Sequence, residues 1–253
     1  MVVGAQLFTV REHTKTPEVL ARTLARVADI GYRVVQVSGT GPFEAGWLAG
    51  ELRKNGLTCA LTHTAPNRIA DETDAVAAEH KLFGCQHVGI GSAPGAFAGG
   101  LADYEAFRDR FMPVAGRLRQ LGMHLGYHNH HFEFARYGGK LILERMAEDF
   151  PAADLTFILD TYWVQFGGCN PAQWVRRLAG RVPCVHFKDM AIVENKQRMA
   201  VVGEGNIDFD EVLSACADAG TQYVLVEQDD CGGEDPFECL RRSFEYLKAR
   251  GLA

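Results

Sequence analysis

Short apolar runs alternate with segments of helical periodicity along the whole chain. Eight runs have the length and composition of buried parallel strands, and each is followed by a segment typical of an amphipathic helix. The predicted strands are Ala5–Val10, Val34–Ser38, Thr58–His63, His87–Gly91, His124–His128, Thr156–Asp160, Pro183–Phe187 and Val224–Glu227. The predicted helices are Pro17–Ile30, Ala45–Asn55, Asp71–Phe83, Tyr104–Leu121, Lys140–Asp149, Pro171–Ala179, Phe209–Ala219 and Pro236–Arg250. This alternation predicts an α/β fold, a (β/α)8 TIM barrel that forms a single domain over residues 1–253.

Three of the connections that follow predicted strands are long, namely Gly91–Asp103, His130–Gly139 and Lys188–Asp208. In a barrel, the connections after the C-terminal strand ends build the active-site face, so long ones predict a covered pocket. A doubly wound open sheet is the alternative architecture. It is disfavoured because no G-x-G-x-x-G motif follows any predicted strand.

Composition and charge restrict the classes of function. The formal net charge is −6 and there is no basic run, which argues against nucleic acid as a partner. No apolar stretch approaches the roughly 18 residues that span a bilayer, and the N-terminal residues lack the pattern of a signal peptide. The seven cysteines are scattered and form no C-x-x-C pair, as expected in a reducing compartment. We therefore expect a cytoplasmic protein without a membrane partner.

Four of the predicted strands end on or beside a residue that can bind a metal ion. These residues are His128, Asp160, His186 and Glu227. The C-terminal strand ends of a barrel converge, so two imidazoles and two carboxylates are expected to meet there. Such a mixed set suits Mn²⁺, Zn²⁺, Co²⁺ or Fe²⁺ and leaves room for two substrate oxygens. A helix cap or a satisfied core histidine explains each residue alone equally well, but four in series favour a metalloenzyme.

Six segments carry a resemblance to a known family. They are QLFTVRE at Gln6–Glu12, GYHNHHFEF at Gly126–Phe134, LDTYW at Leu159–Trp163, HFKDM at His186–Met190, GEGNIDF at Gly203–Phe209 and VEQDD at Val226–Asp230. In this order they resemble the sugar phosphate isomerase/epimerase superfamily, the xylose-isomerase-like TIM barrels. The resemblance implies one divalent metal ion, with Mn²⁺ preferred and Zn²⁺, Co²⁺, Fe²⁺ or Mg²⁺ as alternatives. It also implies a small-molecule sugar or polyol substrate, and barrels of this type often associate into homo-oligomers.

The implied activity is that of a metal-dependent isomerase or epimerase that acts through a metal-stabilised enediolate on a keto- or aldo-sugar. Asp160, His186 and Glu227 match metal positions of the epimerases, but the fifth-strand position, usually a glutamate acid/base, is His128 here. This departure removes half of the symmetric two-glutamate pair and leaves Glu227 as the base. The main alternative is therefore a metal-dependent lyase or hydratase (dehydratase) acting on a 3-keto-sugar or inosose-like polyol. An abasic-site endonuclease is disfavoured by the acidic balance, and a non-catalytic sugar-binding barrel by the intact ligand set.

Further residues near the predicted strand ends are candidates for the site. Glu133 and Lys188 join Glu227 as catalytic candidates, because Glu133 lies just beyond His128 and Lys188 shares the strand face of His186. Glu133 is expected to bind substrate or to orient His128, whereas the alternative for Lys188 is a surface pair with Asp189. Candidates for substrate binding are His63, His130, Trp163 and Phe8. Packing in the core would explain the aromatic residues and His63 equally well.

Overall fold

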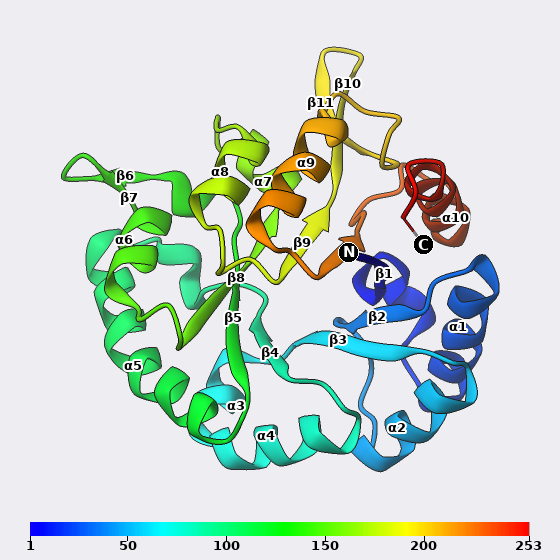
Figure 1. Cartoon of the computed structure of the whole chain (residues 1–253), viewed down its shortest axis with the longest axis horizontal. Helices are drawn as coiled ribbons and strands as arrows, with labels where there is room; N and C mark the ends of the chain where they lie inside the picture. Colours follow the sequence, from blue (N-terminus) through cyan, green and yellow to red (C-terminus); the bar gives the residue numbers. More distant parts are fainter. Residues whose placement is uncertain (253) are drawn as a thin grey trace.

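Eight parallel strands close into a barrel with helices around it (Figure 1). The structure is a computed structural model in which residues 1–252 are described. Around the barrel the strand order is β1-β12-β9-β8-β5-β4-β3-β2. The strands are β1 (Val2–Gln6), β2 (Val34–Val37), β3 (Thr58–His63), β4 (His87–Ile90), β5 (His124–His128), β8 (Leu155–Asp160), β9 (Cys184–Phe187) and β12 (Tyr223–Val226). The predicted α/β barrel is confirmed.

The connections carry the helices and two small hairpins. The helices are α1 (Pro17–Ile30), α2 (Ala45–Lys54), α3 (Pro66–Asp71), α4 (Thr73–Leu82), α5 (Leu101–Gln120), α6 (Ile142–Asp149), α7 (Thr161–Phe166), α8 (Pro171–Arg177), α9 (Phe209–Ala219) and α10 (Pro236–Lys248). The hairpins pair β6 (Arg136–Tyr137) with β7 (Lys140–Leu141), and β10 (Asp189–Val193) with β11 (Lys196–Ala200). The second hairpin projects at the top of Figure 1. Across residues 1–252, no helix combines the length and apolar character that crossing a membrane requires.

The strands are apolar because the barrel buries both of their faces. Inside the barrel, Ile158 of β8 packs with Leu61 and Leu225 in a cluster separate from the larger core between strands and helices. Gly126 of β5 makes room for Ile158, since a Cβ there would lie 2.9 Å from Ile158 Cδ1. This apolar layer fills the interior of the barrel. The polar residues at the C-terminal strand ends form the next layer, at the end of the barrel.

The observed strand β1 begins and ends several residues before the strand that the sequence predicts. Ala5–Val10 was expected to be extended, but β1 ends at Gln6 and Leu7–His13 forms a 3-10 helix. The side chain of Gln6 accepts a hydrogen bond from Phe8 N at 3.2 Å, which turns the chain at this point. Leu7 and Val10 are buried in the turn as they would be in a strand, so the apolar pattern did not distinguish the two.

The predicted helix Asp71–Phe83 is the second of two consecutive helices. α3 (Pro66–Asp71) precedes it, and Glu72, with φ −129° and ψ 37°, separates α3 from α4. The other predicted helices agree with the structure to within a few residues at each end. Boundaries of this kind depend on local backbone angles that periodicity does not encode.

Asp189 supports the long connection after β9. Its carboxylate accepts hydrogen bonds from the backbone N–H groups of Met190 (2.7 Å), Gly203 (2.9 Å), Gly205 (2.9 Å) and Ile207 (3.2 Å). Gly205 is required there, because a Cβ would lie 2.4 Å from Asp189 Oδ1. The GEGNIDF segment is therefore wrapped around one buried carboxylate.

Asp189→Ala should destabilise the protein by about 2–4 kcal/mol, because it removes the shared acceptor of four backbone N–H groups in one loop. Urea unfolding followed by circular dichroism measures the difference. The exposed Asp210→Ala is the control, and it should change the free energy of unfolding by less than about 0.5 kcal/mol. Equal stability of the two variants would contradict the proposed support.

Candidate metal centre and active site

The four predicted metal ligands meet at the C-terminal end of the barrel. One ligand atom each from His128, Asp160, His186 and Glu227 lies within 4.8 Å of the other three, and all four residues are buried. Asp160 Oδ2 lies 3.4 Å from His128 Nε2 and 3.9 Å from His186 Nδ1, and Glu227 Oε2 lies 2.9 Å from His186 Nδ1. His128 and Asp160 are the last residues of β5 and β8, and Glu227 directly follows β12.

In His128 and His186, one ring nitrogen faces away from the carboxylates. The hydrogen bond of that nitrogen determines the tautomer of the ring. His128 Nδ1 lies 2.9 Å from the carbonyl oxygen of Gly91, which only accepts, so Nδ1 carries the proton. His186 Nε2 lies 2.7 Å from Gln36 Oε1, an acceptor as well. The lone pairs of His128 Nε2 and His186 Nδ1 then point at carboxylate oxygens. Two lone pairs facing two carboxylates repel unless a cation lies among them, so the donor set fits a divalent metal ion.

Asp160 uses its two oxygens differently. Oδ1 accepts a hydrogen bond from Trp163 N at 3.0 Å and caps α7, whereas Oδ2 faces the histidines. Burial raises the pKa of this carboxyl, but the ammonium of Lys188 outweighs burial, so its pKa lies below the ordinary value. Asp160 is therefore both a helix cap and an ionised member of the cluster.

Lys188 is a buried part of the cluster. Its side chain is 2% exposed, and Nζ lies 2.7 Å from Asp229 Oδ2, 3.3 Å from Glu227 Oε2 and 3.5 Å from Asp160 Oδ2. Burial lowers the pKa of Lys188, but the three carboxylates raise it by more than burial lowers it. The pKa of Lys188 therefore lies above its ordinary value, and the side chain is an ammonium at neutral pH. The alternative of a surface lysine paired with Asp189 is wrong, because Asp189 faces the Gly203–Ile207 backbone instead.

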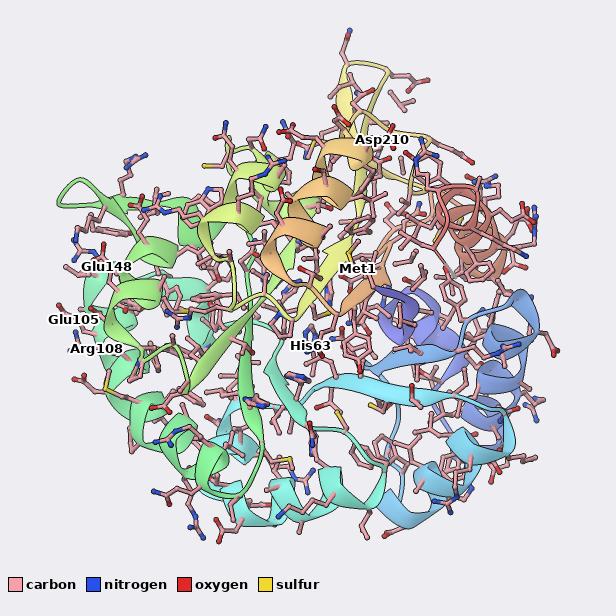
Figure 2. The ribbon with its side chains drawn as sticks, viewed as in Figure 1. Met1, His63, Glu105, Arg108, Glu148 and Asp210 are labelled. Carbon is pink, nitrogen blue, oxygen red and sulfur yellow. The ribbon has the colours of Figure 1, made fainter. Side chains whose placement is uncertain are left out.

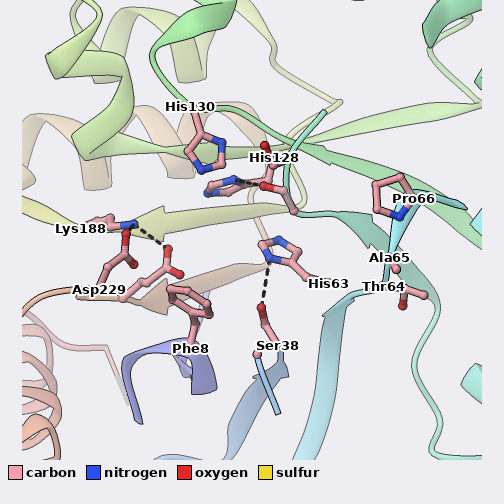
Figure 3. Close-up of a pocket in the computed structure, with 14 residues that line it drawn as sticks. Phe8, Ser38, His63, Thr64, Ala65, Pro66, His128, His130, Lys188 and Asp229 are labelled. Atoms are coloured by element: carbon pink, nitrogen blue, oxygen red, sulfur yellow. Dashed lines mark hydrogen bonds and ion pairs between the residues drawn. The ribbon is translucent and has the colours of Figure 1, made fainter. Parts of the chain in front are cut away.

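A cavity of about 380 Å³ opens above the cluster. Phe8, His63, His130 and Lys188 line it together with His128, Glu227 and Asp229 (Figure 3). His63 lies near the middle of the barrel, whereas Glu105, Arg108 and Glu148 lie on the outer rim (Figure 2). A cavity of this size is large enough for a molecule of the size of one sugar ring, beside His128 and Glu227.

Two histidines of the cavity wall have nitrogens free for a ligand. His63 Nε2 and His130 Nδ1 are buried and have no hydrogen-bond partner within residues 1–252. Burial, with the neighbouring His128, holds the pKa of both imidazoles below the ordinary value, to about 3 for His130. Neutral imidazoles with unmet hydrogen-bonding capacity suit substrate hydroxyl groups.

Trp163 and Glu133 lie behind the cavity wall. Trp163 packs against the ring of His130, with centroids 5.1 Å apart, and Lys188 Nζ lies 5.4 Å from its centroid. Glu133 is fully buried, accepts from Tyr127 Oη at 2.5 Å and from His130 N at 2.8 Å, and makes no bond to His128. The expected orienting contact with His128 is therefore wrong, and Glu133 positions the backbone of His130.

Glu133 should make stability depend on pH. Burial raises the pKa of Glu133 from 4.5 to about 7, so the folded protein holds a proton that the unfolded chain loses. The free energy of unfolding therefore falls as pH rises from about 4.5 to 7 and is level above that range. The side chain of Glu133→Gln cannot ionise. The free energy of unfolding of this variant should therefore rise by about 3 kcal/mol relative to that of wild type between pH 4.5 and pH 8. Urea unfolding at both pH values tests this, and parallel pH profiles would contradict it.

Two polar residues near the cluster, Asp229 and Gln36, are not among the site residues that the sequence predicts. Asp229 lies in the cavity wall, and its Oδ1 is buried without a partner among the described residues. Burial and the charge of Glu227 raise the pKa of Asp229 to about 6. Gln36 sets the tautomer of His186. The signals were present, because Asp229 follows Glu227 by two positions and Gln36 interrupts the apolar run VVQV.

The fold and the site agree with one family of barrels. A family model described as xylose isomerase-like TIM barrel matches residues 24–250. The chain belongs to this family. The predicted membership of the xylose-isomerase-like TIM barrels is therefore confirmed.

Curated relatives share part of the sequence. The chain is 25% identical over 153 residues to an inosose dehydratase of Bacillus thuringiensis (strain Al Hakam), which covers 53% of this chain and 51% of the relative. An inosose dehydratase of Bacillus anthracis is 22% identical over 165 residues, with 58% and 55% covered. The chain thus spans about half the length of the curated relatives it matches.

Solved structures resemble the whole barrel. A sugar phosphate isomerase/epimerase from Parabacteroides distasonis ATCC 8503 superposes with a TM-score of 0.76 at 20% identity, covering 98% of this chain and 93% of that chain. An L-ribulose 3-epimerase superposes with a TM-score of 0.74 at 17% identity, with 98% and 94% covered. At these identities the likeness establishes the fold alone.

Proposed function

We propose that the protein is a metal-dependent lyase that removes a proton next to the carbonyl group of a 3-keto-sugar or inosose-like polyol and expels a group from the neighbouring carbon. The observation that carries this proposal is the asymmetry of the cluster. One wall offers the carboxylate of Glu227 beside the Lys188–Asp229 pair, whereas the facing wall offers the imidazole of His128. One base and one proton source meet the needs of an elimination.

In this reaction, the residues of the site have different roles. Glu227 lines the cavity as an ionised carboxylate, because the ammonium of Lys188 holds its pKa well below the ordinary value against the effect of burial. It accepts the proton from carbon. Lys188 donates hydrogen bonds toward the oxygen on which negative charge develops, and Asp229, 2.7 Å away, completes the proton-donating pair for the departing group. His63 and His130 hold hydroxyl groups of the ring.

His128, Asp160, His186 and Glu227 would hold the divalent cation, for which Mn²⁺ is the preferred candidate. When bound, such a cation acts as a Lewis acid that stabilises negative charge on adjacent substrate oxygens. The charges of the site are then balanced. Asp160, Glu227 and Asp229 are carboxylates, and Lys188 and the cation offset them. The relatives named inosose dehydratase agree with this class of reaction.

The second candidate is a sugar isomerase or epimerase. The structural neighbours with these names favour it, and proton transfer along one face of the substrate by Glu227 is open to both reactions. An epimerase that inverts a centre with two carboxylates is disfavoured, since His128 stands where the second would be. Both candidates share the first step, the removal of a proton beside a carbonyl group.

Product analysis separates the two candidates. The protein, loaded with Mn²⁺, is incubated with inosose and with 3-keto-sugars in deuterium oxide, and the products are followed by mass spectrometry and ultraviolet absorption. Elimination gives loss of water and a conjugated absorbing ketone. Isomerisation gives a product of unchanged composition that carries deuterium. Deuterated product without loss of water, in every substrate tested, would contradict the lyase.

A further inference from the structure

A second cavity lies beside the one above the metal cluster. Its volume is about 430 Å³, compared with about 380 Å³ for the first. Both cavities are lined by residues that follow or end β2 and β3, namely Ser38, Gly39, His63, Thr64 and Ala65. A ligand that extends past these segments from the metal cluster would therefore enter the second cavity.

The shared wall presents an oriented hydrogen-bond acceptor. His80 Nδ1 lies 2.7 Å from the carbonyl oxygen of Val76, so it donates, and His80 Nε2 accepts from the Thr62 hydroxyl at 2.7 Å. The Thr62 oxygen then accepts from the Thr64 hydroxyl at 3.0 Å. This order of donors leaves the lone pairs of the Thr64 oxygen free. Thr64 lines both cavities, so these lone pairs can receive a ligand hydroxyl at the junction.

The second cavity combines aromatic rings with paired charges. Phe43 and Phe83 contribute half-buried rings to its wall. Its one arginine, Arg68, is bound by Glu79 at 2.5 Å and by Glu72 at 3.3 Å. In the first cavity, Lys188 is likewise held by three carboxylates. A phosphate group would therefore find no uncompensated cation in either lining, whereas an uncharged ring with hydroxyl groups and C–H faces fits both.

We infer that the second cavity is a subsite for a second sugar ring, joined through a glycosidic bond to the keto-sugar ring in the first. The substrate class is thus an uncharged glycoside of a keto-sugar. This inference rests on the proposed elimination. Glu227 takes the proton from the carbon beside the carbonyl, a carbon–carbon double bond forms, and the glycosidic carbon–oxygen bond breaks. The departing oxygen keeps the electron pair and takes one proton, so nothing is oxidised or reduced and the released sugar lies in the second cavity.

The test compares one ring with two. With the Mn²⁺-loaded protein, kcat/KM for 3-keto-cellobiose should exceed that for 3-keto-glucose by at least about tenfold. Thr40→Trp should remove this preference, because Thr40 lines only the second cavity, and Phe43→Ala should weaken it by removing a ring from the same wall. Turnover of 3-keto-glucose should stay unchanged in both. Thr58→Trp, at an exposed position at the start of β3, is the matched control and should behave as wild type.

Binding separates failure of the subsite from failure of the reaction. Calorimetry with cellobiose and glucose measures the subsite without turnover, and cellobiose should bind about tenfold more tightly to wild type but not to Thr40→Trp. If neither keto-sugar reacts while this difference persists, the proposed elimination is wrong and the subsite stands. Equal affinities and equal kcat/KM values for one and two rings would overturn the subsite. An equal effect of Thr40→Trp on both substrates would overturn it too.

Discussion

Asp160→Ala should strip the purified protein of its divalent cation. Wild type should contain about one ion per chain, and the variant should bind the ion at least about a hundredfold more weakly, because Asp160 supplies one of only two anionic ligands. Metal analysis of protein dialysed against limiting Mn²⁺ measures the change. The effect is expected to be among the largest of any substitution, since both enzymatic proposals depend on the ion.

Asp160→Asn separates metal binding from helix capping. The alanine variant also loses the hydrogen bond from Trp163 N to Asp160 Oδ1, which contributes about 1 kcal/mol to stability. Asparagine keeps an oxygen for this cap but removes the negative charge. Asp160→Asn should therefore lose the metal and keep its stability in the presence of a chelator. Asp210→Ala, at an exposed carboxylate, should keep full occupancy.

Retention of the ion in both Asp160 variants would contradict the proposed centre. In that case the assignment of lone pairs to His128 and His186 would be wrong, and one imidazole would carry a second proton, taken from water and stabilised by the nearby carboxylates. A barrel without a metal would then carry Lys188 and one imidazolium as the positive charges beside Asp160, Glu227 and Asp229. The metal analysis therefore tests both the site and its charge balance.

The cluster of proposed metal ligands could be predicted from the sequence, because each of the four residues ends an apolar run or lies one residue from its end. A parallel barrel brings the C-terminal strand ends together, so the position of a residue at the end of a run is enough to place His128, Asp160 and His186 near one another. The misplacement of β1, whose apolar run Leu7–Val10 continues as a 3-10 helix, does not affect this reasoning, because none of the four residues lies on β1.

The environment of each polar side chain was harder to predict. Lys188 is buried because carboxylates from β8 and from the segment after β12 surround it, and such partners are distant in the sequence. Glu133 turns away from the cavity because Tyr127 and the backbone of His130 satisfy its oxygens. Neither outcome follows from local pattern. The partners that the folded chain brings into contact decide whether a charged residue near a strand end faces the cavity or supports the wall behind it.

In the proposed reaction, the Lys188–Asp229 pair distinguishes this site from a symmetric epimerase site. Glu227 Oε2 lies 3.3 Å from Lys188 Nζ, so the proposed base and the proposed proton donor are neighbours on one wall. A proton removed from carbon on this side stays close to the group that leaves. Such an arrangement favours both elimination and an isomerisation that moves the proton along one face of the substrate. Inversion of a stereocentre instead requires a second acid/base group on the opposite side of the substrate. The pair is therefore the best place to test the chemistry apart from the metal.

Lys188→Met should lower kcat by about a hundredfold to a thousandfold while the metal content remains close to one ion per chain. The variant removes the ammonium that stabilises developing negative charge, yet it leaves all four metal ligands in place. KM should change much less than kcat, because the interaction strengthens as charge develops on the substrate. Steady-state kinetics on the substrate identified by product analysis, with metal analysis of the same preparation, measures both quantities.

Lys196→Met is the matched control, since Lys196 is exposed on β11 and lies outside the cavity lining. It should keep the kcat of wild type. In Lys188→Met the bound cation remains to offset Asp160, Glu227 and Asp229, so the variant should fold when loaded. Removal of the ion should destabilise it more than wild type, because the three neighbouring carboxylates, two of them buried, then lack any counter-charge. Wild-type kcat in Lys188→Met would show that Lys188 balances charge and takes no part in catalysis, and Asp229 alone would then remain as the proton donor.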